Sequence, residues 1–166
     1  MYELKLRRLP SLDTILQLAS SQTDVREHAL RYFMDNFDKS FSNIWKGGVY
    51  HQRPFIPAVN YTGESVLGTA SDVYTEETCA ILGVNVIPST SFFYKFACRK
   101  LKLTQKPDVT KVVAILRERP PLDAVRADQW FSYLSATVGS KPLMRLVLSQ
   151  VDQGHRACRL LQFTAQ

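Results

Sequence analysis

The chain has 166 residues and a net charge of +6, with 45% hydrophobic and 22% charged residues. These values and the 9 Phe, 7 Tyr and 2 Trp residues are typical of a single globular domain with its own core. They exclude disordered, collagen-like and disulfide-scaffold proteins. The longest aliphatic run, residues 112–116, is far shorter than the ~20 residues that cross a bilayer, so we expect no membrane span.

Residues 1–48 predict a helical hairpin. Ser11 is a good N-cap after Pro10, and apolar residues follow it at helical spacing. Thr23 or Asp24 caps a longer helix that Gly47 and Gly48 end, and the very short turn between the helices favours an antiparallel pair. The longer helix carries an apolar stripe of Val25, Ala29, Tyr32, Phe33, Phe37, Phe41, Ile44 and Trp45.

Residues 49–88 predict a segment of strands and irregular structure. Residues 54–59 contain two prolines and are expected to be extended. Residues 60–63 have turn chemistry, so residues 65–69 can pair back as a small antiparallel β-hairpin. Two short elements are expected before Pro88, a helix over 76–82 that Gly83 ends and a strand over 84–87.

Residues 89–166 predict a basic helical part. Ser89 or Thr90 caps a helix that continues through Leu103, and Asp108 caps a helix over 109–119. Further helices are expected over 124–138 and 141–151, which together predict a helical bundle. The whole chain is therefore expected to be one α+β domain, predominantly helical. In the helix that is expected to run from Ser89 or Thr90 through Leu103, the residues expected to face inward are Phe92, Phe93, Phe96, Ala97 and Leu101.

The sequence lacks the common motifs of cofactor and metal sites. It has no glycine-rich phosphate loop, no nucleophile elbow, no HExxH helix and no CxxC pair, so we expect neither a cofactor nor a metal. The three cysteines are odd in number and widely spaced, which favours a reducing compartment. The amino terminus has no apolar signal region. We therefore expect an intracellular protein, either cytoplasmic or nuclear.

Candidate catalytic residues are few and isolated. Glu76 and Glu77 are adjacent in a predicted helix, where side chains point about 100° apart, and they are better explained as acids at the start of that helix. His28 is expected to face solvent. An enzyme built on Cys98 or His51 is the least favoured class, because no local signature of a Cys–His site is present. The sequence predicts a protein that is not an enzyme.

The positive charge is concentrated in the second half of the chain. Residues 1–83 hold 8 Lys and Arg against 10 Asp and Glu, a net of −2, whereas residues 84–166 hold 13 against 5, a net of +8. Four cations at spacings of 4, 3 and 4 are predicted to line one helical face, with Lys100 beside them. They are Lys95, Arg99, Lys102 and Lys106, hereafter the basic residues.

The basic residues allow three interpretations. They could contact an acidic surface of another protein, or they could follow the phosphates of a nucleic acid. They could also be a solvated face that maintains solubility. No exposed aromatic residue is predicted between the charges, which weakens the nucleic-acid interpretation.

Three stretches of the sequence together resemble a known family. They are residues 9–33, the Phe-Ile-Pro run at 55–57 with residues 70–74, and residues 106–134. This pattern resembles a region of very large fungal proteins with a sacsin-like or NO VEIN-like organisation, which carry an Hsp90-type ATPase domain ahead of helical modules. The resemblance covers residues 9–138 and implies an association with chaperones. The ATP-binding motifs of that ATPase are absent from this sequence.

Taken together, these patterns predict a non-catalytic protein-interaction or scaffold module. The expected partner is another protein with an acidic surface, which the basic residues would contact. The alternative is a basic nucleic-acid-binding module.

Overall fold

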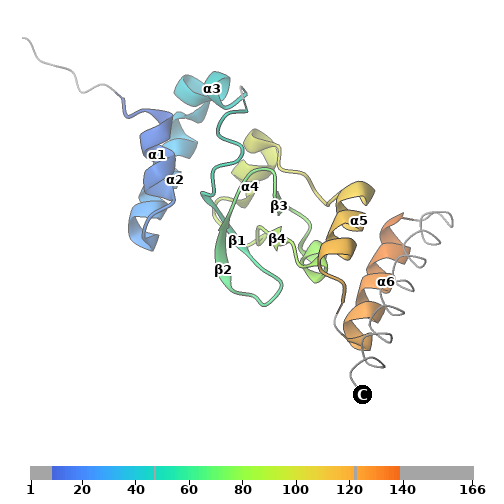
Figure 1. Ribbon diagram of the computed structural model, residues 1–166. Helices are drawn as coiled ribbons and strands as arrows, with labels where there is room; N and C mark the ends of the chain where they lie inside the picture. The colour runs from blue at the N-terminus through green and yellow to red at the C-terminus, as the bar shows by residue number, and fades with distance from the viewer. Residues whose placement is uncertain (1–8, 47, 122, 139–166) are drawn as a thin grey trace, which may run out of the picture.

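The computed structural model describes residues 9–46, 48–121 and 123–138. A helical hairpin lies at one end, a small sheet in the middle and two further helices at the other end (Figure 1). This arrangement confirms the predicted α+β, predominantly helical class. Among the described residues, no helix is long and apolar enough to cross a membrane.

The helical hairpin consists of α1 (Leu12–Ala19) and α2 (Thr23–Asn36), which lie side by side (Figure 1). Ser11 is the N-cap as predicted, and its hydroxyl accepts a hydrogen bond from the Thr14 amide at 3.2 Å. The predicted cap of the second helix is wrong. Gln22 is the N-cap and forms no side-chain cap bond, so α2 begins at Thr23, one residue earlier than a Thr23 cap and two earlier than an Asp24 cap would allow.

The long helix that follows the turn is not one regular α-helix. After α2 the chain forms a π-helix, η1 (Phe37–Phe41), and then the short α3 (Ser42–Lys46). A π-turn contains an extra residue, which shifts the faces of the helix that follows it. Phe33, Phe37 and Trp45 are buried as the apolar stripe predicts, but Val25 and Ile44 are exposed.

The predicted β-hairpin is confirmed. β1 (Ile56–Val59) pairs with β2 (Ser65–Gly68) antiparallel, with Ala58 opposite Val66. The Asn60 side chain shapes the turn, because its Oδ1 accepts the amides of Thr62 and Glu64. Gly63 supplies the positive φ of 82° that the turn requires.

Two short strands extend this hairpin to a four-stranded sheet. β3 (Val73–Tyr74) and β4 (Asn85–Val86) are parallel to each other, and the strand order is β2-β1-β4-β3. The predicted short helix is the 3₁₀-helix η2 (Glu77–Leu82). Gly83 ends it with a φ of 77°, as its position predicts.

The predicted helix from Ser89 or Thr90 through Leu103 is much shorter in the structure. It consists of α4 (Tyr94–Phe96) and a second π-helix, η3 (Ala97–Leu101), and Lys102 ends it with a left-handed φ of 55°. Phe92 lies before the helix and is 39% exposed, which corrects its predicted inward position. The other four residues predicted to face inward are buried.

The last two described helices are α5 (Val109–Glu118) and α6 (Ala124–Val138). Asp108 caps α5 as predicted, with its carboxylate 2.8 Å from the Lys111 amide. The bounds of α6 match the prediction. The helix predicted over 141–151 lies outside the described residues.

The core is divided into a large cluster and smaller ones. The large cluster joins the hairpin, the sheet and the α4–η3 helix around Phe33, which is fully buried. A second cluster joins η2 with α5 and α6. The rings that surround Phe33 at centroid distances of 5.4 to 6.2 Å are those of Phe37, Phe41, Trp45, Phe55 and Phe96.

Candidate interaction surfaces

All four basic residues are exposed, but they do not share one helical face. Lys95 lies on α4 and Arg99 on η3. Lys102 ends the helix, and Lys106 lies beyond it, between η3 and α5. The helical spacing predicted for the set therefore holds only for Lys95 and Arg99, because the left-handed turn at Lys102 directs the chain away from the helix axis.

The basic residues differ from neighbouring cations in their partners. Lys100 contacts Asp38 at 2.6 Å, and Lys111 lies 3.6 Å from Asp72. None of the four basic residues forms an ion pair within the part of the chain that the structure describes.

An exposed aromatic residue lies close to this surface in the sequence. Phe92 precedes Lys95 by three residues, and the guanidinium of Arg31 on α2 lies 4.8 Å from the centroid of its ring. The same guanidinium contacts Glu27 at 2.7 Å. The sequence alone did not reveal this pairing, because it joins residues about sixty positions apart.

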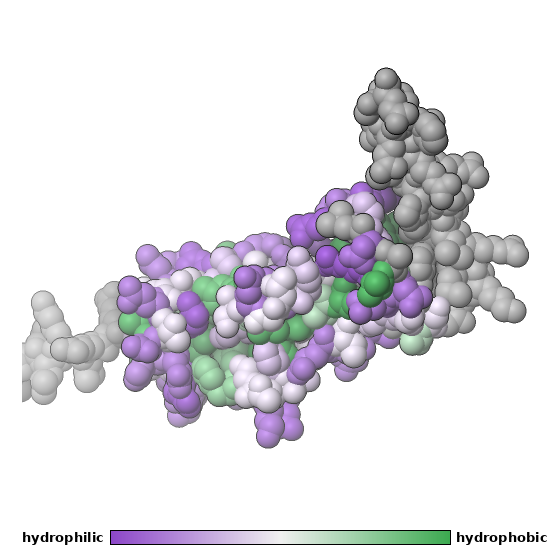
Figure 2. Space-filling view, turned by 90° about the horizontal axis from the view of Figure 1, so that it is seen from below, coloured by the Kyte–Doolittle hydropathy of each residue, from purple (hydrophilic) through white to green (hydrophobic). Residues whose placement is uncertain are grey.

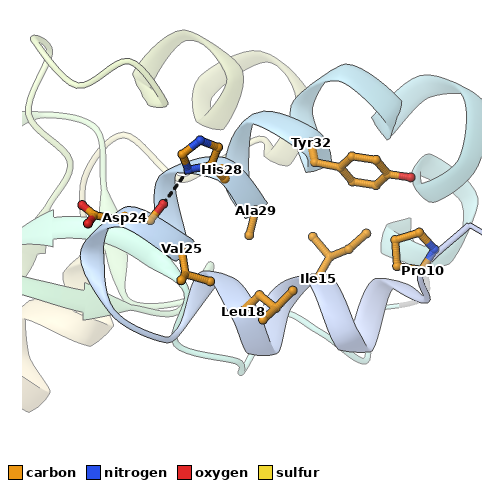
Figure 3. Close-up of a pocket in the computed structure, with 8 residues that line it drawn as sticks. All are labelled: Pro10, Ile15, Leu18, Asp24, Val25, His28, Ala29 and Tyr32. Atoms are coloured by element: carbon orange, nitrogen blue, oxygen red, sulfur yellow. Dashed lines mark hydrogen bonds between the residues drawn. The ribbon is translucent and has the colours of Figure 1, made fainter.

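A second surface is a groove on the outer side of the α1–α2 hairpin, with a volume of about 620 Å³. Figure 3 shows Ile15 and Leu18 of α1 facing Val25 and Ala29 of α2 across it. Two further lining residues, Pro10 and Tyr32, lie at one end. In the view from below, hydrophobic residues also reach the surface in patches between hydrophilic ones (Figure 2).

The residues considered for catalysis are not brought together. The ring of His51 lies 4.7 Å from that of Trp45, and its Nε2 is 3.2 Å from the Trp45 carbonyl oxygen. Cys98 lies on η3, and a hydrogen bond with its thiol raises the pKa of the Tyr94 hydroxyl. His28 is exposed as predicted, with its Nδ1 2.8 Å from the Asp24 carbonyl.

The two adjacent acids make separate local contacts. Glu76 accepts a hydrogen bond from the Thr78 hydroxyl at 2.7 Å, and Glu77 accepts the Ser89 amide at 2.7 Å. That hydrogen bond from the Ser89 amide lowers the pKa of Glu77. In the described ranges, no group of three or more His, Cys, Asp or Glu residues is placed to hold a metal ion.

One polar contact that the sequence did not predict joins two elements. The thiol of Cys79 on η2 lies 3.1 Å from the hydroxyl of Tyr133 on α6. Burial raises the pKa of this thiol, which makes it a poor nucleophile. The contact helps to position α6 against η2.

Comparison with known proteins identifies one family. No curated protein and no solved structure matches the chain. A model of a protein family does match, over residues 1–150, and so covers the helical hairpin, the sheet and both helices α5 and α6. The chain belongs to this family, which is described as DUF3684, a protein of unknown function.

Proposed function

We propose that the chain is a non-catalytic protein-interaction or scaffold module, and that the basic residues contact an acidic surface of another protein. The observation that carries the proposal is that Lys95, Arg99, Lys102 and Lys106 are exposed and unpaired among the described residues. Exposed unpaired cations create a positive potential that attracts an acidic surface. The resemblance to sacsin-like proteins supports an association of this module with chaperones.

The second candidate function is nucleic-acid binding. The observation that favours it is the exposed ring of Phe92, three residues before Lys95, with the Arg31 guanidinium beside it. Aromatic rings and Arg planes stack on unpaired bases, while neighbouring cations contact phosphates. Such binding would weaken steeply as salt rises, because it releases counterions.

A charge-reversal triple variant tests the proposal. The variant combines Lys95→Glu, Arg99→Glu and Lys102→Glu. The wild-type chain and this variant are each used to capture partners from native extract at low and at moderate salt. Mass spectrometry and nucleic-acid staining then identify what is retained. We expect the wild type to retain a defined set of acidic proteins at moderate salt and the variant to lose it.

A matched control separates the local surface from the net charge. The control variant combines Lys39→Glu, Arg117→Glu and Arg119→Glu. It changes the net charge by the same amount as the first variant, but at other exposed cations, and it should retain the partners. Both variants should melt within a few degrees of the wild type, because all six side chains are exposed. Equal capture by the two variants would overturn the proposal, and retention of nucleic acid alone, lost steeply with salt, would favour the alternative.

A further inference from the structure

We propose that the α1–α2 groove is a second docking site, and that it binds an amphipathic basic helix of a partner protein. This inference goes beyond the proposed function, since it concerns a different surface and the opposite charge. The α1–α2 groove lies on the helical hairpin, and this hairpin is at one end of the molecule (Figure 1). None of the basic residues lines this groove.

The groove is largely apolar, and two of its lining residues are exposed among the described residues. Leu18 and Val25 line it, and they are 45% and 42% exposed. Leu9, directly before the lining residue Pro10, is 62% exposed. Contiguous exposed apolar residues with a polar rim are typical of protein-binding surfaces.

The lining favours a helix over an extended peptide. Its polar side chains are those of Asp24, His28 and Tyr32, and Nδ1 of His28 is already bonded to the Asp24 carbonyl (Figure 3). An extended peptide would bury backbone amides and carbonyls that the groove cannot satisfy, at a substantial cost. A helix satisfies these groups internally and presents apolar side chains at spacings of three and four residues.

Two carboxylates that form no ion pair within the described residues select the charge of the partner. Two neighbouring acids are already paired, because Asp13 contacts Arg53 and Glu27 contacts Arg31. Neither Asp24 nor Asp35 forms an ion pair with any described residue. Asp24 lines the groove, and Asp35 lies two helical turns beyond His28 on the same face of α2.

The separation of these two acids defines the partner further. Asp24 and Asp35 are eleven residues apart, about 16 Å along the axis of α2. A docked helix that carries Lys or Arg at positions eleven residues apart would place one cation beside each carboxylate. Glu at the same positions would be repelled. We therefore expect the partner helix to combine an apolar stripe with two such cations.

The test uses three synthetic helical peptides of about 16 residues that share one leucine stripe. The first has two Lys residues eleven apart, the second has Glu at those positions, and the third has both Lys residues moved to the opposite helix face. Their binding to the full chain is measured by fluorescence anisotropy. We expect the first peptide to bind at least tenfold more tightly than either of the others.

Variants of the chain assign this binding to the α1–α2 groove. The double variant Leu18→Asp with Val25→Asp should weaken binding of the first peptide at least tenfold. The matched control, Val49→Asp with Val125→Asp, changes exposed residues outside the groove and should leave this binding unchanged. Asp24→Asn with Asp35→Asn should abolish the preference for Lys over Glu. The proposal is overturned if all three peptides bind equally, or if the Leu18–Val25 variant binds like its control.

The same assay keeps this proposal separate from the proposed function. The Lys95–Arg99–Lys102 reversal should leave peptide binding unchanged, because those residues lie on other elements. Loss of peptide binding in that variant, with its melting temperature preserved, would contradict the placement of the site in the groove.

Discussion

Lys102 has a left-handed backbone, with a φ of 55°, where η3 ends. This conformation costs an L-residue about 1–2 kcal/mol, a cost that glycine avoids. Glycine also loses more chain entropy on folding, which offsets part of the gain. We therefore expect Lys102→Gly to raise the free energy of unfolding by about 0.5–1 kcal/mol.

Urea denaturation measures this change. The control is Lys95→Gly, which removes the same charge from α4, where the backbone is helical. Glycine there should lower the free energy of unfolding by about 1 kcal/mol. Destabilisation by both substitutions would show that the backbone of Lys102 is not strained.

The two described cysteines differ in burial, and their reactivity should differ accordingly. Cys79 is fully buried, and its burial raises the pKa of the thiol, so little thiolate exists at neutral pH. Cys98 is partly exposed. We expect iodoacetamide to alkylate Cys98 in the folded protein and Cys79 only in urea, as measured by mass spectrometry of the peptides. Equal rates in the folded state would contradict the burial of Cys79.

At the scale of elements, the contact between β2 and β3 depends on Gly68. A Cβ atom at Gly68 would overlap Cγ2 of Val73, a stiff side chain that is 1% exposed. Overpacking of this kind costs about 1–3 kcal/mol. We expect Gly68→Ala to lower the free energy of unfolding by that amount, as measured by urea denaturation.

A double-mutant cycle isolates the cause of this loss. Val73→Ala removes the methyl groups that the new Cβ would meet, so Gly68→Ala should cost much less in that background. An equal cost in both backgrounds would show that the effect of Gly68→Ala comes from the strand backbone, and not from the contact with Val73.

The sequence predicts those elements well whose signals are local. Ser11 and Asp108 cap their helices, and Asn60 with Gly63 shapes the hairpin turn, because each acts on neighbouring backbone groups. The π-helices η1 and η3 leave no such signal. Both lie in the packed core, where Phe37 of η1 contacts Phe96, the residue before η3.

The candidate surfaces show the same limit. The exposure of the basic residues was predictable from their charge, but the left-handed turn that separates Lys106 from the helix was not. The α1–α2 groove escaped prediction for a different reason. Val25 fits the apolar stripe of α2 by its spacing, and only the packed hairpin shows that it is exposed.

At the scale of the whole molecule, the two tryptophans report on separate parts of the core. Trp45 belongs to the large cluster around Phe33, and Trp130 belongs to the cluster of η2, α5 and α6. Among the described residues, the second cluster buries far fewer side chains than the first. Parts of a protein with fewer buried contacts open at lower free energy.

Single-tryptophan variants measure this difference. Trp45→Phe leaves the fluorescence of Trp130, and Trp130→Phe leaves that of Trp45, since the chain has 2 Trp. Because the smaller cluster has less apolar surface to hold it, we expect the Trp130 signal to change at a lower urea concentration than the Trp45 signal. Far-ultraviolet circular dichroism of both variants is the control, and it should show the same transitions in each. Coincident fluorescence transitions would mean that both clusters unfold as one unit.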